Sequence, residues 1–308
     1  MSRCPTHSHE LAGVSGLASA HVSVGMPVYN GERWIRSAIQ SILAQDYSDL
    51  DLIISDNAST DATEDICRAF AANDPRVHYH RNSRNLGVDA NYNRVAQLAQ
   101  GRYFKWAAAN DVCAPRFISA CVDVLERRPD VVVCCPRTQL IIDDKGTREP
   151  YLDGLTLEDA SPYIRFRRYL SEVQLNNVFH GVIRAEALRQ TKLLRFHRCS
   201  DYALVSELAL RGKFVEVPES LFFRRMTPES ATRFQSESQI AEYYSPGGRR
   251  LLFQDWKQEF SYLSAVRGAP VGLIDKFRLY HYLARRLWWA RGNLGRDLFR
   301  SLRALSER

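Results

Sequence analysis

Two kinds of apolar pattern alternate along the chain from residue 21 onward. Short segments dense in apolar and β-branched residues have the length of buried strands, and they cover residues 21–29, 50–56, 76–82 and 102–109. Between them, apolar residues recur every three or four positions, as in a helix with one buried face, over residues 32–45, 59–73 and 88–100. This alternation predicts an α/β fold with parallel βαβ units in a doubly wound, mostly parallel sheet flanked by helices.

The pattern is less regular after Pro115. It predicts a helix, an apolar strand broken by Pro136, a strand entering a helix, a helix capped by Ser200 or Asp201, and two short strands around Pro218; these cover residues 116–128, 130–142, 177–188, 200–212 and 213–226. Residues 150–178 show no clear periodicity. The end of the chain is predicted to be helical, because its leucines recur every three or four residues in two rows. These are Leu279, Leu283 and Leu287, then Leu294, Leu298, Leu302 and Leu305.

These patterns predict three regions. Residues 1–20 form a leader without regular structure. Residues 21–235 form one α/β domain, with halves at about 21–115 and 116–235. Residues 236–308 form a helical, basic C-terminal appendage.

Polar residues follow each of the first four predicted strands. They are Pro27 to Asn30, Asp56 to Ser59, Arg81 and Asn82 with Asn85 to Gly87, and Asn110 with Asp111. Ligands of such sheets bind beyond the carboxyl ends of the strands, so these residues are expected to line one crevice. Alternatively, Asp56 and Ser59 cap the next helix and residues 82–87 form a turn. The glycine-rich signatures of dinucleotide and P-loop sites are absent from the sequence.

Composition narrows the class further. Of the 308 residues, 45% are hydrophobic and 25% charged, as in an ordinary globular protein. Seven cysteines without a C-x-x-C spacing argue against a zinc site or a disulfide framework and favour reduced thiols. The sequence shows no signal peptide and no apolar run of membrane-spanning length, so we expect a cytoplasmic protein.

Three long stretches resemble glycosyltransferase family 2, whose members have the GT-A fold. They are VSVGMPVYNGERWIRSAIQSILAQDYSDLDLIISDNASTD, NLGVDANYNRVAQLAQGRYFKWAAANDVCAP and HRCSDYALVSELALRGKFVEVPESLFFRR. The resemblance covers roughly residues 22 to 232. It implies an inverting enzyme that takes a sugar from a nucleotide-sugar donor, with UDP favoured, and passes it to a glycan or lipid-linked acceptor.

The resemblance also implies roles for individual residues. The donor would be bound by the residues at the strand ends and by two arginines: Pro27, Val28, Tyr29, Asn30, Glu32, Asp56, Ser59, Asn85, Gly87, Asn110, Arg224 and Arg225. Asp201 would be the general base, although it also fits a helix cap. His180 and Gly181 lie where the family often contacts the acceptor.

The metal motif departs from the family pattern. The family's D-x-D-D becomes Ala108, Ala109, Asn110 and Asp111, so only Asp111 keeps its carboxylate. Mg²⁺ and Mn²⁺ need oxygen ligands, and Mg²⁺ is often held by one or two carboxylates together with phosphates and water. The resemblance therefore implies a Mg²⁺ or Mn²⁺ ion on Asp111, held more weakly than by two acids.

Alternative functions stay open at this point. The missing acids suit a GT-A scaffold protein without activity, and a sugar-phosphate nucleotidyltransferase has a similar sheet. Residues 271–308 hold nine Lys or Arg against three Asp or Glu. They suit a peripheral contact with the inner face of a membrane, a helix packed on the catalytic domain, or a homodimer contact. Nucleic-acid binding is not indicated, because no known binding module is present.

Overall fold

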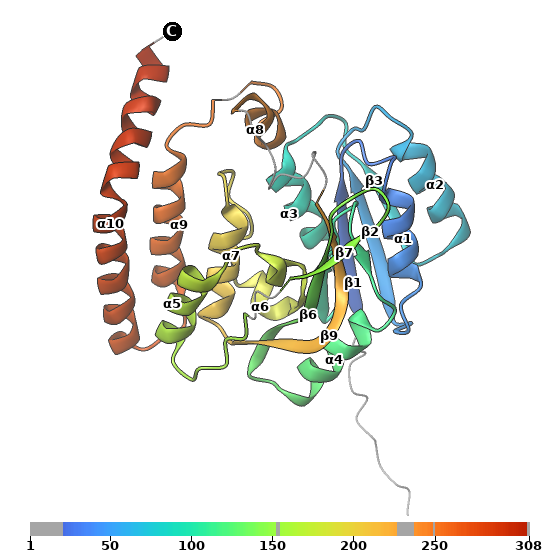
Figure 1. Cartoon of the computed structure of the whole chain (residues 1–308), viewed down its shortest axis with the longest axis horizontal. Coiled ribbons are helices and arrows are strands. Elements are labelled where there is room, and N and C mark those ends of the chain that lie inside the picture. Colours follow the sequence, from blue (N-terminus) through green and yellow to red (C-terminus); the bar gives the residue numbers. More distant parts are fainter. Residues whose placement is uncertain (1–20, 152–154, 227–236, 249, 307–308) are drawn as a thin grey trace, which may run out of the picture.

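The computed structural model describes residues 21–151, 155–226, 237–248 and 250–306. The expected leader at 1–20 lies outside the described residues. A single mixed sheet runs through the molecule, with strands in the order β3-β2-β1-β4-β8-β6-β9-β5 and with β7 paired to β6 (Figure 1). The strands are β1 Val22–Val28, β2 Leu50–Asp56, β3 Val77–Arg81, β4 Tyr103–Trp106, β5 Val112–Cys113, β6 Val131–Ile141, β7 Arg148–Tyr151, β8 Val182–Arg184 and β9 Lys213–Arg225.

The four strands predicted first are parallel neighbours in the sheet. Strand β8 is antiparallel to β4 and to β6, whereas β9 runs parallel to β6, so the sheet is mixed. The carboxyl ends of β1, β2, β3, β4, β6 and β9 consequently lie at one edge. The predicted α/β class is confirmed. The polar residues that follow the first four strands start from this shared edge, where the crevice was expected.

Helices cover both faces of the sheet (Figure 1). One face packs against α1 Ile35–Leu43, α2 Thr63–Asn73 and α4 Phe117–Arg127, and the other against α3 Val88–Leu98, α6 Ala185–Arg189 and α7 Ser200–Ala209. The alternation of β2 shows the division: Leu52 and Ile54 enter the first core and Ile53 enters the second. Every predicted helix between residues 32 and 128 is present.

Three local predictions were wrong. Pro136 does not break its strand, and residues 213–226 form one long strand rather than two. The β6–β9 register shifts at Pro136/Arg137, and the next pair, Arg137 with Ser220, leaves Pro218 in the resulting bulge. A proline is tolerated there because the bulge interrupts the hydrogen-bond ladder. The N-cap of α7 is Cys199, with a left-handed backbone and no side-chain cap, rather than Ser200 or Asp201.

The less regular part of the chain contains one further helix. Helix α5 spans Pro162–Glu172. At its start the Ser161 side chain accepts a hydrogen bond from the Ile164 N–H. A 3-10 turn, η1, spans Asn177–His180 and leads into β8. Both elements lie beside α7, which makes them part of the surroundings of Asp201.

The C-terminal region consists of α8 Glu237–Tyr244, α9 Gln254–Gly268 and α10 Leu273–Ser306. Helices α9 and α10 lie side by side and pack on α5 and α7 (Figure 1). Their shared core includes Phe166, Tyr262, Leu279 and Leu283. Of the alternatives that the sequence left open for this region, packing on the α/β domain is the one observed. Among the described helices, none is long and apolar enough to cross a membrane.

Trp106 joins the sheet to η1, and its removal tests how far the core depends on this contact. Its ring is fully buried and stacks on Phe179 with 4.5 Å between ring centroids, and its Nε1–H donates to the Tyr92 carbonyl at 3.1 Å. We expect Trp106→Ala to lower the free energy of unfolding by about 3–5 kcal/mol, measured by urea denaturation. The exposed Trp289→Ala is the control and should change it by less than about 0.5 kcal/mol. Equal effects of the two variants would contradict the prediction.

Candidate active site

The loops after β1 and β2 are joined by hydrogen bonds at the carboxyl edge of the sheet. Asn30 has a positive φ of 49°; its N–H donates to Ser59 Oγ at 2.9 Å and its Oδ1 accepts from the Thr60 N–H at 2.8 Å. Glu32 Oε2 accepts from the Ala62 N–H at 2.9 Å. Asn30, Glu32 and Ser59, all predicted donor residues, therefore come together at one place.

Asp56 lies at the base of these loops and is fully buried. Its Oδ1 accepts from the Ser59 N–H at 2.9 Å, and its Oδ2 accepts from Tyr79 Oη at 2.7 Å and from Arg81 Nη1 at 2.6 Å. Both carboxylate oxygens are thus engaged within the protein. In this structure Asp56 connects the loop after β2 to strand β3, and contact with a nucleobase stays a prediction.

A group of buried asparagines connects the ends of β1, β2 and β3. Asn82 Nδ2 donates to Asn57 Oδ1 at 3.0 Å and to Asn91 Oδ1 at 3.1 Å, and Asn57 Nδ2 donates to Asn85 Oδ1 at 2.6 Å. Asn91 Nδ2 also donates to the Val28 carbonyl at 3.3 Å. Asn57, Asn82 and Asn85 were expected at these strand ends from the sequence. Asn91 was missed, because it lies within helix α3 and no local pattern marks a helix residue that contacts the strand ends.

The remaining predicted residues of these loops differ in exposure. Pro27 is buried within β1, whereas Tyr29 is 45% exposed just after it. Gly87 has a φ of +86°, and a Cβ there would lie 2.7 Å from the Tyr244 carbonyl oxygen of α8. Gly87 is therefore needed both for its backbone conformation and for the close approach of α8. Among these residues, the Tyr29 ring is the one that reaches solvent at the strand end.

Asp111 follows β4 and lies against the end of β9. Its Oδ1 accepts from the Arg225 N–H at 2.8 Å, and Arg225 Nε donates to the Asn110 carbonyl at 3.1 Å. The Arg225 guanidinium lies 3.7 Å from the centroid of the Trp34 ring. Burial raises the pKa of Asp111 to about 6, although the charge of Arg224 opposes this.

Two adjacent asparagines hold the candidate base and the second arginine. Asn176 accepts from Tyr169 Oη at 3.0 Å and donates to Asp201 Oδ2 at 2.9 Å. Asn177 Oδ1 accepts from Arg224 Nη1 at 2.7 Å. Arg225, the next residue of β9, donates its N–H to Asp111 Oδ1, so the end of β9 connects the surroundings of Asp111 and Asp201. Sequence reasoning missed Asn176 and Asn177, because they lie in the stretch without clear periodicity.

Asp201 is in the first turn of α7 and is partly exposed. Burial raises its pKa above the usual range, and the hydrogen bond from Asn176 partly offsets this effect. The carboxylate thus has one fixed hydrogen bond while part of the residue remains open to solvent. That combination suits a group that must be oriented and still reach a substrate.

A buried lysine holds η1 against β4. Lys105 is fully buried; its Nζ donates to the carbonyls of His180 and Trp106 and lies 4.0 Å from the centroid of the Phe117 ring. Burial lowers the pKa of Lys105. Because η1 leads on from the two asparagines, Lys105 supports the position of Asp201 indirectly. Sequence reasoning did not single out Lys105 within its predicted strand.

His180 and Gly181 are placed inside the fold. His180 is 8% exposed, its ring contacts Phe179 and Phe222, and burial lowers its pKa well below the usual value. A Cβ at Gly181 would lie 2.7 Å from the Cys134 carbonyl oxygen, so close packing explains this glycine. Contact of either residue with an acceptor stays a prediction.

The surroundings of Asp111 offer few protein ligands for a divalent cation. Within the described residues, no three His, Cys, Asp or Glu side chains gather in a possible metal site. Asp111 Oδ1 already accepts a backbone hydrogen bond, which leaves Oδ2 as its one oxygen without a hydrogen-bond partner in the described part of the chain. A single carboxylate fits Mg²⁺ or Mn²⁺ only when phosphate oxygens and water complete the ligand set.

Comparison with known proteins identifies the family. The model of glycosyl transferase family 2 matches residues 23–195, which is more than half of the chain. This chain belongs to glycosyltransferase family 2. Among its curated relatives are an uncharacterized glycosyltransferase of Rickettsia typhi, 33% identical over 164 residues, and one of Haemophilus influenzae, 26% identical over 216 residues. The matches cover 53% and 67% of this chain, and 47% and 65% of those relatives.

Solved structures agree with this assignment. TarS of S. aureus superposes with a TM-score of 0.63 at 15% identity, over 89% of this chain and 73% of the TarS chain. Structures of TarS in complex with UDP and with UDP-GlcNAc superpose similarly, with TM-scores of 0.63 and 0.64. At this identity the likeness establishes the fold alone. The GT-A fold implied by the sequence resemblance is therefore confirmed.

A further carboxylate of this family 2 chain lies beside Asp201. Asp89, in the first turn of α3, is 4% exposed, and its Oδ1 accepts from Ser200 Oγ at 3.0 Å. Its Oδ2 has no hydrogen-bond partner within the described residues. Burial, together with the nearby charge of Asp201, raises the pKa of Asp89 to about 7 despite the hydrogen bond from Ser200. The stability of the contact between α3 and α7 is therefore expected to depend on the protonation of Asp89.

This coupling predicts a pH-dependent effect of Asp89→Asn. An unfolded Asp has a pKa of about 3.9, so between about pH 4 and 7 the folded state binds more protons than the unfolded state. The contribution of Asp89 to the free energy of unfolding therefore decreases as pH rises through this window. We expect Asp89→Asn to gain stability relative to wild type between pH 5 and pH 8, measured by urea midpoints. Asp123→Asn, on an exposed part of α4, controls for loss of one charge; the same change in both variants would refute the coupling.

Proposed function

We propose that this chain transfers a sugar, with inversion, from a nucleotide-sugar donor to a hydroxyl group of a glycan or glycolipid acceptor. The observation that carries the proposal is the pair of arginines at the end of β9. Arg225 donates its N–H to Asp111 Oδ1, and Arg224 Nη1 donates to Asn177, whose neighbour Asn176 donates to Asp201 Oδ2. Cationic side chains at such a place suit a leaving diphosphate, because they stabilise the negative charge that develops on it.

The donor is assigned to the loops after β1, β2 and β3. Tyr29 supplies an exposed ring, and Asn30, Glu32 and Ser59 supply a set of hydrogen-bonded polar groups around it. Pro27, Val28, Asp56, Asn85 and Gly87 shape the walls. UDP is favoured because the TarS structures, which share this fold, include complexes with UDP and UDP-GlcNAc.

The leaving diphosphate is assigned to the ends of β4 and β9. Guanidinium groups match phosphate oxygens in geometry and charge, which suits Arg224 and Arg225 to this role. Asp111 would hold the divalent cation, and Asn110 lies beside it. When bound, such an ion acts as a Lewis acid that stabilises the negative charge developing on the departing phosphate.

Asp201 is assigned as the general base. As the acceptor oxygen forms its bond to the anomeric carbon, its proton passes to the Asp201 carboxylate and the bond to the diphosphate breaks. Burial raises the pKa of Asp201, which brings it nearer to the range in which proton transfer is efficient. Attack from the face opposite the leaving group inverts the anomeric carbon.

Nucleotide binding provides the first test. A ligand that binds the folded state raises the melting temperature, by a few degrees when its concentration is about a hundred times its Kd. We expect UDP with Mn²⁺ to stabilise the wild type in a thermal-shift panel of UDP, GDP, dTDP and CDP. The added effect of Mn²⁺ should disappear in Asp111→Ala, while Asp123→Ala should behave as wild type. Absence of stabilisation by every nucleotide would favour a GT-A scaffold without transfer activity.

Replacement of the candidate base provides the second test. Asp201→Asn keeps the shape and the first turn of α7 but removes the proton acceptor, so transfer should fall by about 10²–10⁴-fold. Stabilisation by the nucleotide should be retained, because Asp201 is not part of the assigned donor site. The measurement is release of UDP from UDP-GlcNAc in the presence of glycan acceptors. Unchanged release would show that Asp201 has only a structural role.

A further inference from the structure

Helix α10 has a buried side and an apolar outward side. Leu279, Leu283 and Leu294 are buried against the rest of the fold. On the opposite side, Phe277 is 74% exposed, Trp288 66% and Phe299 72%. A helix packed by one face normally shows polar residues on the other. Three large aromatic side chains in water therefore need an explanation.

These aromatics form a straight row. Phe277, Trp288 and Phe299 are separated by 11 residues each, and Leu273 and Leu302 lie on the same side of the helix. Eleven residues make three turns of about 3.67 residues each, so the row runs nearly parallel to the helix axis. A straight apolar row suits a flat partner surface.

Basic residues border this row. By helical spacing, Arg278, Arg285 and Arg296 lie along one flank of it, and all three are exposed. The two acids of the helix are used elsewhere: Asp275 Oδ1 accepts from Ser161 Oγ at the start of α5, and Asp297 Oδ2 accepts from the Asp255 N–H of α9. The outward side of α10 is consequently apolar in the middle and cationic at its margin.

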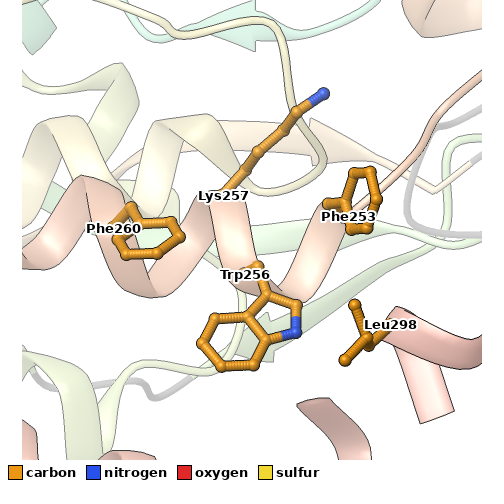
Figure 2. Close-up of a pocket in the computed structure, with 5 residues that line it drawn as sticks. All are labelled: Phe253, Trp256, Lys257, Phe260 and Leu298. Carbon is orange, nitrogen blue, oxygen red and sulfur yellow. The ribbon is translucent and has the colours of Figure 1, made fainter. Parts of the chain in front are cut away.

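The apolar surface extends onto α9. A hollow of about 410 Å³ is lined by Phe253, Trp256, Phe260 and Leu298, with Lys257 at its edge. Figure 2 shows the Trp256 and Leu298 side chains on one side of α9, while Lys257 extends away from them. Phe260 is 58% exposed and Leu298 40% exposed. The hollow thus widens the apolar surface at the C-terminal half of α10.

We propose that the outward face of α10, with the adjoining hollow of α9, docks on an anionic phospholipid bilayer. Aromatic side chains enter the interfacial layer, and arginines beside them pair with negative head groups. A second copy of this chain fits less well, because two such faces packed together would bring their arginine flanks near each other, while Asp275 and Asp297 are engaged elsewhere. Charge complementarity therefore selects the lipid.

The docking face is connected to the candidate base. The Phe253 N–H donates to Ser301 Oγ of α10 at 2.8 Å, and the neighbouring Gln254 Oε1 accepts from the Arg198 N–H at 2.9 Å. Arg198 lies three residues before Asp201. A bilayer bound to this face would therefore contact the helices that support the loop before Asp201.

The experiment is co-sedimentation of the 308-residue chain with vesicles of phosphatidylcholine, with or without about one-third phosphatidylglycerol. We expect binding to the anionic vesicles that weakens between about 0.05 M and 0.5 M salt, because screening reduces the attraction. Arg285→Glu with Arg296→Glu, and separately Trp288→Ser with Phe299→Ser, should each weaken binding about tenfold or more. These side chains are exposed, so circular dichroism should show both variants folded.

Matched controls separate specific docking from general charge or stickiness. Arg116→Glu with Arg127→Glu changes the net charge equally on α4, which lies far from α10 (Figure 1). Phe196→Ser with Leu98→Ser removes exposed apolar side chains outside α10. Both controls should bind as wild type. Equal loss in controls and α10 variants, or no binding to anionic vesicles, would overturn the proposal.

Light scattering without lipid tests the competing occupant. A dimer that Trp288→Ser with Phe299→Ser converts to a monomer would assign the face to a second copy and overturn the proposal. A mass that is the same in wild type and variant, together with lipid binding, supports it. Vesicle binding is measured without any transfer reaction, so its failure would not bear on the proposed activity.

Discussion

A buried polar group must find a hydrogen-bond partner, and this requirement shapes the carboxyl edge of the sheet. Asn91 shows it most directly. Its Nδ2 donates to the carbonyls of Val28 and Ser55, and its Oδ1 accepts from Ser55 and Asn82, so one amide spans the ends of two strands and the start of a third loop. With these groups satisfied internally, the loops hold their shape before any ligand arrives. Preorganisation of this kind lowers the cost of binding.

The same edge concentrates charge in a region of low exposure. Burial raises the pKa values of Asp89, Asp111 and Asp201, while Arg224 opposes the effect at Asp111 and Asp201. Asparagines rather than additional charges orient the base and Arg224. An amide can fix a carboxylate by hydrogen bonding without neutralising it, which leaves Asp201 able to accept a proton. The arrangement is therefore compatible with the proton transfer that we propose for Asp201.

The C-terminal helices, unlike the carboxyl edge of the sheet, leave large apolar side chains exposed. Helix α10 satisfies its packing with one side only, through Leu279, Leu283 and Leu294, and keeps Phe277, Trp288 and Phe299 in solvent. Exposed apolar surface of this kind is costly unless a partner covers it. The hydrogen bonds from Phe253 to Ser301 and from Arg198 to Gln254 connect that surface to the loop before the candidate base. The region thus links a proposed lipid-facing surface with the loop that precedes Asp201.

The sequence by itself determined the local elements and the edge at which they meet. Apolar periodicity is a short-range signal, so β2 was predicted at its observed bounds, and Asn30 and Asp56 were expected at the edge where Ser59 joins them by hydrogen bonds. Only the tertiary structure decided what depends on distant contacts. Pro218 fits into a continuous strand because β9 bulges there against β6, and Asn176 meets Asp201 because α5 and η1 pack on α7. The leucine rows of α10 were visible in the sequence, but which of them is buried depends on where α9 lies, and no local pattern encodes that position.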